Sequence, residues 1–230
     1  MQLGIVPYLE ALELQRSLAA AVSQGAIPDT VLFLEHPPVV TLGRRTEKGE
    51  LHVPEGAEIE IVETDRGGKS TYHAPGQLVC YPILDLTRHG TDVKRYCRDL
   101  EEALIRTLAP FGLEATRIEG LTGIWLQPPP RKIASIGIHV ARWITTHGYA
   151  LNVDLDPAPF TQWITACGLE DAQFTTIARE LGRPMAVDEV RPPAAAALAE
   201  VFDLELEELP AEEGAGLWPQ PVHAKLAAKR

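Results

Sequence analysis

Strand-like segments follow one another along this chain without the regular helical crossovers that a parallel sheet requires. The apolar runs that predict strands occupy seven stretches: residues 30–34, 39–42, 59–62, 78–86, 124–126, 132–143 and 145–153. Successive parallel strands need a connection of a dozen or more residues, whereas antiparallel strands need only a tight turn. The order of the runs therefore favours an α/β (α+β) fold, with a mixed, largely antiparallel central sheet flanked by helices.

Amphipathic periodicity predicts four helices, over residues 7–24, 92–111, 171–181 and 192–202. The clearest is the second, whose apolar stripe consists of Val93, Tyr96, Cys97, Leu100, Leu104 and Leu108. The two longest strands are expected to form an antiparallel hairpin, with residues 145–148 separating their cores. We expect one domain over residues 1–202, followed by an acidic segment and a tail over residues 203–230.

Composition excludes several classes of function. The 230 residues carry a net charge of −11, which argues against general nucleic-acid binding. No apolar run approaches the roughly 18 residues of a membrane helix, and the first residues lack the basic region of a signal peptide. The three Cys are widely spaced and the seven His are scattered, without the spacing of metal ligands. We therefore expect a cytoplasmic protein without a metal, a nucleic-acid partner or a membrane partner.

A glycine-rich stretch, R-G-G-K-S-T-Y-H-A-P-G-Q, occupies residues 66–77 and leads directly into an apolar run. Such density of Gly is typical of a backbone that turns tightly or lies against a ligand. Arg66 and Lys69 flank the glycines and could meet an anionic or carbonyl-bearing ligand. A phosphate-binding P-loop is a poor match, because Glu63 stands where the motif needs Gly and Pro75 would stop the helix that must follow. A surface hairpin without a ligand stays open as an alternative.

Cys167 is the candidate nucleophile among the three cysteines. Cys80 lies within an apolar strand and Cys97 on the helix stripe, so both are interpreted as small hydrophobic residues. Cys167 precedes Gly168, which suggests a turn that presents the sulfur. Lys132, at the start of a strand, could supply the cation that a thiolate needs or, once neutral, act as a base. A structural Cys and an edge-strand Lys remain the alternatives.

Other polar residues in loop-like segments have simpler interpretations when they are taken one at a time. His73 and His147 each lie beside a Gly or Ala, and each is interpreted as a structural His with its hydrogen bonds satisfied. Ser135 and Asn152 similarly could be ordinary hydrogen-bonding groups.

Four stretches together resemble the signatures of the lipoyl(octanoyl) transferase family, within the biotin/lipoate protein ligase superfamily. They occur in the family's order: residues 66–83, from Arg66-Gly67-Gly68 to Tyr81-Pro82-Ile83; residues 132–137, K-I-A-S-I-G; residues 147–153, H-G-Y-A-L-N-V; and Ala166-Cys167-Gly168. Each stretch alone would be a weak signal, whereas four in order are specific. The departure is Ala74, where the family usually has Gly; Ala there would strain the loop if the position needs a positive φ.

The resemblance implies a catalytic domain with the fold of biotin and lipoate protein ligases. It also implies transfer of an octanoyl group from octanoyl-acyl carrier protein to a lysine of lipoyl domains, through a thioester on Cys167 assisted by Lys132. The acceptors would be the lipoyl domains of 2-oxoacid dehydrogenase complexes and the glycine cleavage H protein, with no cofactor. The substrate-binding residues that it implies are Arg66, Gly67, Gly68, Lys69, Ser70, Thr71, Tyr72, His73, Ser135, Ile136, Gly137, Gly148, Tyr149 and Ala150.

Three other functions remain open at this point. An ATP-dependent lipoate-protein ligase shares the fold and the glycine-rich loop, but is not expected to carry a nucleophilic Cys at this place. A non-catalytic acyl- or carrier-binding module would bind without turnover. A thioesterase would release free octanoate without an acceptor. The candidate cations for docking an acidic carrier are Arg44, Arg45, Arg131 and Arg142.

Overall fold

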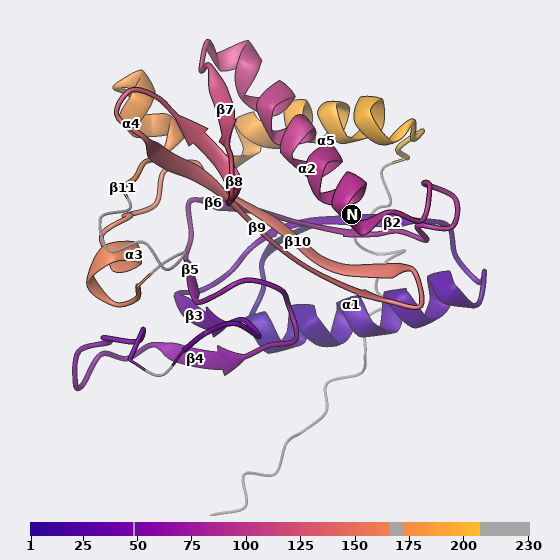
Figure 1. Cartoon of the computed structure of the whole chain (residues 1–230), viewed down its shortest axis with the longest axis horizontal. Coiled ribbons are helices and arrows are strands. Elements are labelled where there is room, and N and C mark those ends of the chain that lie inside the picture. Colours follow the sequence, from indigo (N-terminus) through magenta and orange to yellow (C-terminus); the bar gives the residue numbers. More distant parts are fainter. Residues whose placement is uncertain (48, 166–172, 208–230) are drawn as a thin grey trace, which may run out of the picture.

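The structure, a computed structural model, describes residues 1–47, 49–165 and 173–207 (Figure 1). Its large sheet has the strand order β1-β2-β6-β10-β9-β8-β7, with β11 beside β9. These strands are β1 (Gln2–Ile5), β2 (Thr30–Glu35), β6 (Gln77–Ile83), β7 (Ala115–Ile118), β8 (Leu121–Leu126), β9 (Arg131–Ala141), β10 (Ile144–Asn152) and β11 (Gln173–Phe174).

Antiparallel pairing dominates the large sheet. In the strand order β2-β6-β10-β9-β8-β7, every neighbouring pair is antiparallel. Strand β1 pairs with β2 in parallel, and so does β11 with β9. Every residue of β6 is buried, because this central strand is covered on both faces. The prediction of a mixed, largely antiparallel sheet is confirmed.

A second, three-stranded sheet carries the glycine-rich stretch. It has the order β4-β3-β5, with β3 (Val39–Leu42) between β4 (Glu60–Glu63) and β5 (Thr71–His73). The segment between β4 and β5 is therefore anchored at both ends, and its residues bend back toward the large sheet. The sequence did not predict β5, because its three residues lie within a stretch interpreted as a loop.

Helices cover both faces of the large sheet (Figure 1). Helix α1 (Tyr8–Ser23) packs on one face, where its apolar residues form a cluster with those of β2 and β6. Helices α2 (Val93–Leu108) and α5 (Val187–Phe202) pack on the other face and enclose the largest core cluster. A 3-10 turn (Ala109–Phe111), α3 (Pro159–Gln162) and α4 (Ile177–Leu181) complete the helices of the described residues, among which none is long and apolar enough to cross a membrane.

The hairpin of β9 and β10 has its turn elsewhere than predicted. Residues 145–148 lie inside β10, and the chain reverses at Arg142 and Trp143, whose φ values are 51° and 69°. Two consecutive positive φ values suit the twist of a two-residue hairpin, although Gly or Asn is the usual occupant. The sequence therefore carried no turn signal at the true position.

Two predicted helices also needed correction. Within residues 171–181 the described part is the strand β11 followed by the short helix α4, which begins where the Thr176 side chain accepts a hydrogen bond from the Arg179 amide. Helix α5 begins before Pro192, at Val187, because Glu189 accepts a hydrogen bond from the Ala186 amide and satisfies an otherwise free donor.

Candidate active site

A cavity of about 770 Å³ lies between the two sheets. One wall is the glycine-rich loop, and the other is formed by β9 and β10. Residues that had been predicted to bind substrate line both walls: Arg66, Gly67, Gly68, Lys69, Ser70, Thr71, His73, Ser135, Ile136, Gly137, Gly148, Tyr149 and Ala150. Lys132 lines the cavity as well, whereas Cys167 lies outside the described residues.

Tyr72 is the predicted binding residue that does not line the cavity. Its ring packs instead against Phe160 and Trp163, at centroid distances of 5.7 Å each. The reason is strand alternation: in β5 the side chain of Tyr72 points away from the cavity, whereas its neighbours Thr71 and His73 line it. The prediction that Tyr72 meets substrate is thus not supported by its position.

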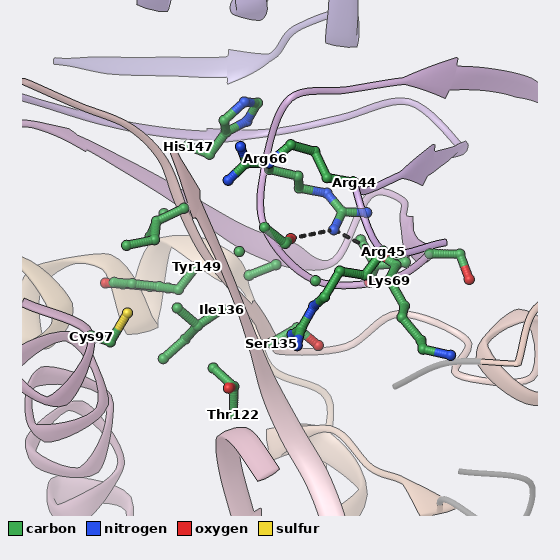
Figure 2. Close-up of a pocket in the computed structure, with 18 of the residues that line it drawn as sticks. Arg44, Arg45, Arg66, Lys69, Cys97, Thr122, Ser135, Ile136, His147 and Tyr149 are labelled. Atoms are coloured by element: carbon green, nitrogen blue, oxygen red, sulfur yellow. Dashed lines mark hydrogen bonds between the residues drawn. The ribbon is translucent and has the colours of Figure 1, made fainter. Parts of the chain in front are cut away.

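The Arg66 guanidinium organises the glycine-rich loop around itself. It is buried and donates to the Thr41 carbonyl at 2.6 Å, to the Thr41 hydroxyl at 2.8 Å, and to the carbonyls of Gly67 and Lys69 at 3.1 and 2.7 Å (Figure 2). A planar fork of five donors suits such a set of convergent acceptors. Arg66 therefore braces the loop from within.

The two walls approach each other at glycines. The Gly67 amide donates to the Ile138 carbonyl at 2.8 Å, and a Cβ at Gly137 would lie 3.1 Å from the Gly67 carbonyl oxygen. A side chain at Gly137 would push the loop away and widen the cavity. Ala74, the departure from the family pattern, is buried without a positive φ, so it does not strain the loop.

Lys132 brings a buried amine to the cavity. The residue is 3% exposed, and its Nζ donates to the Thr122 carbonyl at 2.9 Å and lies 5.3 Å from the centroid of the Trp125 ring. A Cβ at Gly123 would lie 2.7 Å from Lys132 Cε, so Gly123 leaves the space that the amine end occupies. Three residues of β8 thus hold one side chain of β9 in place.

Buried histidines and tyrosines line the part of the cavity around His147. His147 donates from Nε2 to Asp65 at 2.8 Å, and its Nδ1 lies 3.5 Å from the Tyr8 hydroxyl. Burial lowers the pKa of His147, and the hydrogen bond from His147 holds the pKa of Asp65 below its usual range. His147 also has a φ of 57°, a conformation that costs energy in a non-glycine residue.

Two further histidines extend this cluster. His73 lies 2.7 Å from the Gln77 side chain, and burial lowers its pKa well below the ordinary value. His36 donates from Nδ1 to the Val6 carbonyl at 2.7 Å and accepts from the Tyr81 hydroxyl at 2.7 Å, while burial lowers its pKa to about 4. His73 and His147 both make side-chain hydrogen bonds, as expected of structural His residues, and both also line the cavity.

The opposite end of the cavity is largely apolar. Ile136, Tyr149 and Cys97 gather there, across from Arg45 and Lys69 (Figure 2). Cys97 was predicted as a core residue of α2, but its sulfur borders this space. The sequence also did not indicate Tyr8, Thr122 and Trp125 as lining residues. Tyr8 and Trp125 lie in a predicted helix and a predicted strand that indicated only the core, and Thr122 lies just before that strand.

This arrangement can hold an apolar chain at one end and an amine beside it. Among the described residues, no group of three or more His, Cys, Asp or Glu side chains could bind a metal ion. Arg131 is paired in a bidentate manner with Glu180, at 2.9 Å for both bonds, so this cation is committed to the fold rather than free for docking.

The comparison with known proteins agrees with the geometry. Residues 7–199 match the model of the lipoyl protein ligase A/B catalytic domain. An octanoyltransferase of Mycobacterium tuberculosis is 52% identical over 204 residues, which cover 88% of this chain and 86% of that protein. The chain belongs to the octanoyltransferase family.

Other relatives support the same assignment. An octanoyltransferase of Chloroflexus aurantiacus is 47% identical over 209 residues, covering 88% of this chain and 93% of that protein. Among solved structures, a lipoate-protein ligase A bound with ATP superposes with a TM-score of 0.73 at 18% identity, covering 94% of this chain and 91% of that one. This last likeness concerns the fold, which is that of the ligase catalytic domains.

Proposed function

We propose that the protein transfers an octanoyl group from octanoyl-acyl carrier protein to a specific lysine of lipoyl domains, in the cytoplasm. The observation that carries the proposal is the buried Lys132 amine beside a cavity with an apolar end, in a chain about half identical to octanoyltransferases. A medium-length saturated chain suits the apolar end, where Ile136 and Tyr149 would contact it.

The reaction would proceed in two steps, with Cys167 as the nucleophile. The Cys167 thiolate attacks the donor thioester, a new C–S bond forms, and the donor leaves as its thiol after taking a proton from the Lys132 ammonium, which becomes the neutral amine. The lysine amine of the lipoyl domain then attacks the Cys167 thioester, an amide forms, and the Cys167 thiolate is released. The proton lost by the amine passes to the neutral amine of Lys132 or to solvent.

The two partners would be used in turn. The acyl carrier protein delivers the octanoyl group, and the acceptors are the lipoyl domains of 2-oxoacid dehydrogenase complexes and the glycine cleavage H protein. Neither step requires a nucleotide or a metal, since the thioester is already activated for acyl transfer.

The test is mass spectrometry of the protein after incubation with octanoyl-acyl carrier protein. We expect an octanoyl adduct on a peptide containing Cys167, no adduct in Cys167→Ser, and an unchanged adduct in the control Cys80→Ser, a residue outside the cavity lining. An adduct that survives Cys167→Ser would contradict the proposal. Product formed from free octanoate only with ATP would favour a ligase, and free octanoate released without an acceptor would favour a thioesterase.

A further inference from the structure

A buried carboxylate lies behind the wall of the cavity that carries Lys132. Glu101, on helix α2, is 3% exposed and lies outside the cavity lining. Helix α2 packs against β7, β8 and β9, so Glu101 lies close to the strands that hold the lysine. A charge buried to this extent needs compensating partners. The proposed acyl transfer, as described so far, gives this carboxylate no role.

Two arginines contact one oxygen of the carboxylate. Glu101 Oε2 accepts hydrogen bonds from Arg98 Nη1 at 2.7 Å and from Arg117 Nε at 3.1 Å. Arg117 comes from β7, whereas Arg98 lies one turn earlier on α2. These two contacts compensate the buried charge, and the second oxygen, Oε1, faces β8.

The Glu101 carboxylate and the Lys132 amine contact opposite ends of one peptide unit. The Gly123 amide donates to Glu101 Oε1 at 3.5 Å, and Lys132 Nζ donates to the Thr122 carbonyl at 2.9 Å. That amide and that carbonyl belong to the same planar peptide bond, which carries a dipole. A negative charge at the N–H end polarises the carbonyl and strengthens its attraction for an ammonium group. Because 3.5 Å is longer than the usual hydrogen-bond range, this effect is mainly that of a charge on a dipole.

The conformation of Gly123 holds this peptide in its orientation. Its φ of 114° is one that residues with side chains rarely adopt. The pairing of β8 with β9 shifts register immediately afterwards, between Ile124 and Trp125. The local backbone thus directs the N–H of the preceding peptide toward α2 and its carbonyl toward the lysine.

The Glu101 charge also acts on the cavity lining. Burial, and after it the charge of Glu101, raise the pKa of the Cys97 thiol, one turn earlier on α2. Cys97 lines the same cavity as Lys132. The field of this carboxylate therefore reaches the space in which the amine would react.

Other elements around Lys132 do not replace this negative charge. Strands β8 and β11 pair the uncharged Trp125 and Phe174 with it. Arg45, across the cavity in Figure 2, is a cation. A cation disfavours an ammonium group nearby, whereas the Glu101 carboxylate favours it.

We propose that Glu101 is a positioning residue for Lys132, which acts through the peptide between Thr122 and Gly123. It fixes the direction of the acceptor carbonyl and stabilises the ammonium form of the amine. The inference rests on the proposed function, in which that ammonium donates the proton that the leaving thiol takes.

The experiment removes the charge while keeping the size of the side chain, in Glu101→Gln. The matched control is Glu102→Gln, whose carboxylate also accepts from Arg117, at 2.9 Å, but whose other oxygen accepts from Arg106. Trace labelling of amines with acetic anhydride over a range of pH, read by peptide mass spectrometry, gives the pH at which Lys132 is half reactive. Single-turnover acylation by octanoyl-acyl carrier protein is followed over the same range.

We expect Glu101→Gln to lower the pH of half-labelling of Lys132 by about one unit, because a negative charge is lost while Arg98 and Arg117 remain. The acylation rate needs the ammonium form, so its fall at alkaline pH should move down by the same amount. Its maximum should drop about fivefold, since the acceptor carbonyl is no longer held in one direction. Glu102→Gln should match the wild type in both measurements.

Three outcomes would overturn the inference. The first is an equal pH of half-labelling in Glu101→Gln and the wild type. The second is the same shift in Glu102→Gln, which would indicate a general effect of net charge. The third is slower acylation by Glu101→Gln with an unmoved pH profile and a lower melting temperature, which would indicate a purely structural role. A wild type that the carrier protein does not acylate would instead refute the proposed function, because the labelling does not depend on turnover.

Discussion

Lys132 depends on its neighbours for the position of its amine. The Thr122 carbonyl accepts a hydrogen bond from Nζ at 2.9 Å, and the Trp125 ring lies under the charge. Gly123 has a φ of 114° and leaves the space beside Lys132 Cε. In the proposed mechanism the amine must meet reacting atoms within a narrow range of distances, so we expect these neighbours to control its reactivity.

Gly123→Ala should therefore lower kcat by about 100-fold, because a Cβ there would lie 2.5 Å from the Ala134 carbonyl oxygen and 2.7 Å from Lys132 Cε, and so shifts both the β8–β9 pairing and the Lys132 amine. The matched control is Gly112→Ala, which shares a positive φ of 72° but has open space around it and lies outside the cavity lining. Steady-state kinetics and circular dichroism should show a folded Gly123→Ala with low kcat. Equal kcat in the two variants would contradict this assignment.

His36 should make stability depend on pH. Burial lowers its pKa from about 6.5 to about 4. Between these two pH values His36 binds a proton in the unfolded chain but not in the folded protein. The free energy of unfolding should thus fall by about 3 kcal/mol as pH drops from 7 to 4. Urea titrations at several pH values measure this slope, to which His73 and His147 add in the same direction.

His36→Gln removes the titrating group and should flatten part of that slope. His52→Gln, an exposed histidine for comparison, should leave the slope as it is. If the free energy of unfolding changes with pH equally in His36→Gln and the wild type, other titrating groups cause the loss of stability in acid.

At the scale of elements, the ends of helices and strands were harder to predict than their existence. The apolar stripe of α2 identified the helix because a period of 3.6 residues extends over four turns. The turn of the β9–β10 hairpin was misplaced because Arg142 and Trp143 adopt positive φ values without Gly or Asn. Strand β5 was missed because its three residues are held by pairing with β3, a contact distant in sequence.

Helix α2 offers a test at this scale. The Asp92 carboxylate accepts hydrogen bonds from the amides of Lys94 and Arg95, at 2.8 and 3.1 Å. Asp92→Ala should lower the free energy of unfolding by about 1 kcal/mol through loss of this cap. Chemical denaturation measures the change, and Asp92→Asn, which retains an acceptor oxygen, should lose less. If Asp92→Ala leaves the free energy of unfolding unchanged, the packing of α2 alone determines where the helix begins.

At the scale of the whole molecule, the site joins segments that are far apart in the chain. Four motifs in order indicated which residues belong together, and the cavity brings most of them to two facing walls. The sequence could not indicate Cys97 or Thr122 as lining residues, because their place depends on how α2 and β8 pack. Nor could it show that Arg66 is buried within its own loop.

The domain boundary can be tested by shortening the chain. The core includes Phe202 and reaches Leu204, so a protein ending at residue 207 should keep the stability and acylation rate of the full chain. A protein ending at residue 200 loses Phe202, whose ring packs on Tyr96 at 5.7 Å, and should be destabilised by about 3 kcal/mol or more. Thermal unfolding compares the two. Equal melting temperatures for the two shortened proteins would place the end of the domain at or before residue 200.

The two walls of the cavity belong to different sheets, joined where the Gly67 amide meets the Ile138 carbonyl at 2.8 Å. An inhibitor that fills the space would act as a crosslink between them. At a hundred times its Kd it should add about 2.7 kcal/mol to the free energy of unfolding. A shift in melting temperature would then reveal such compounds without any assay of turnover.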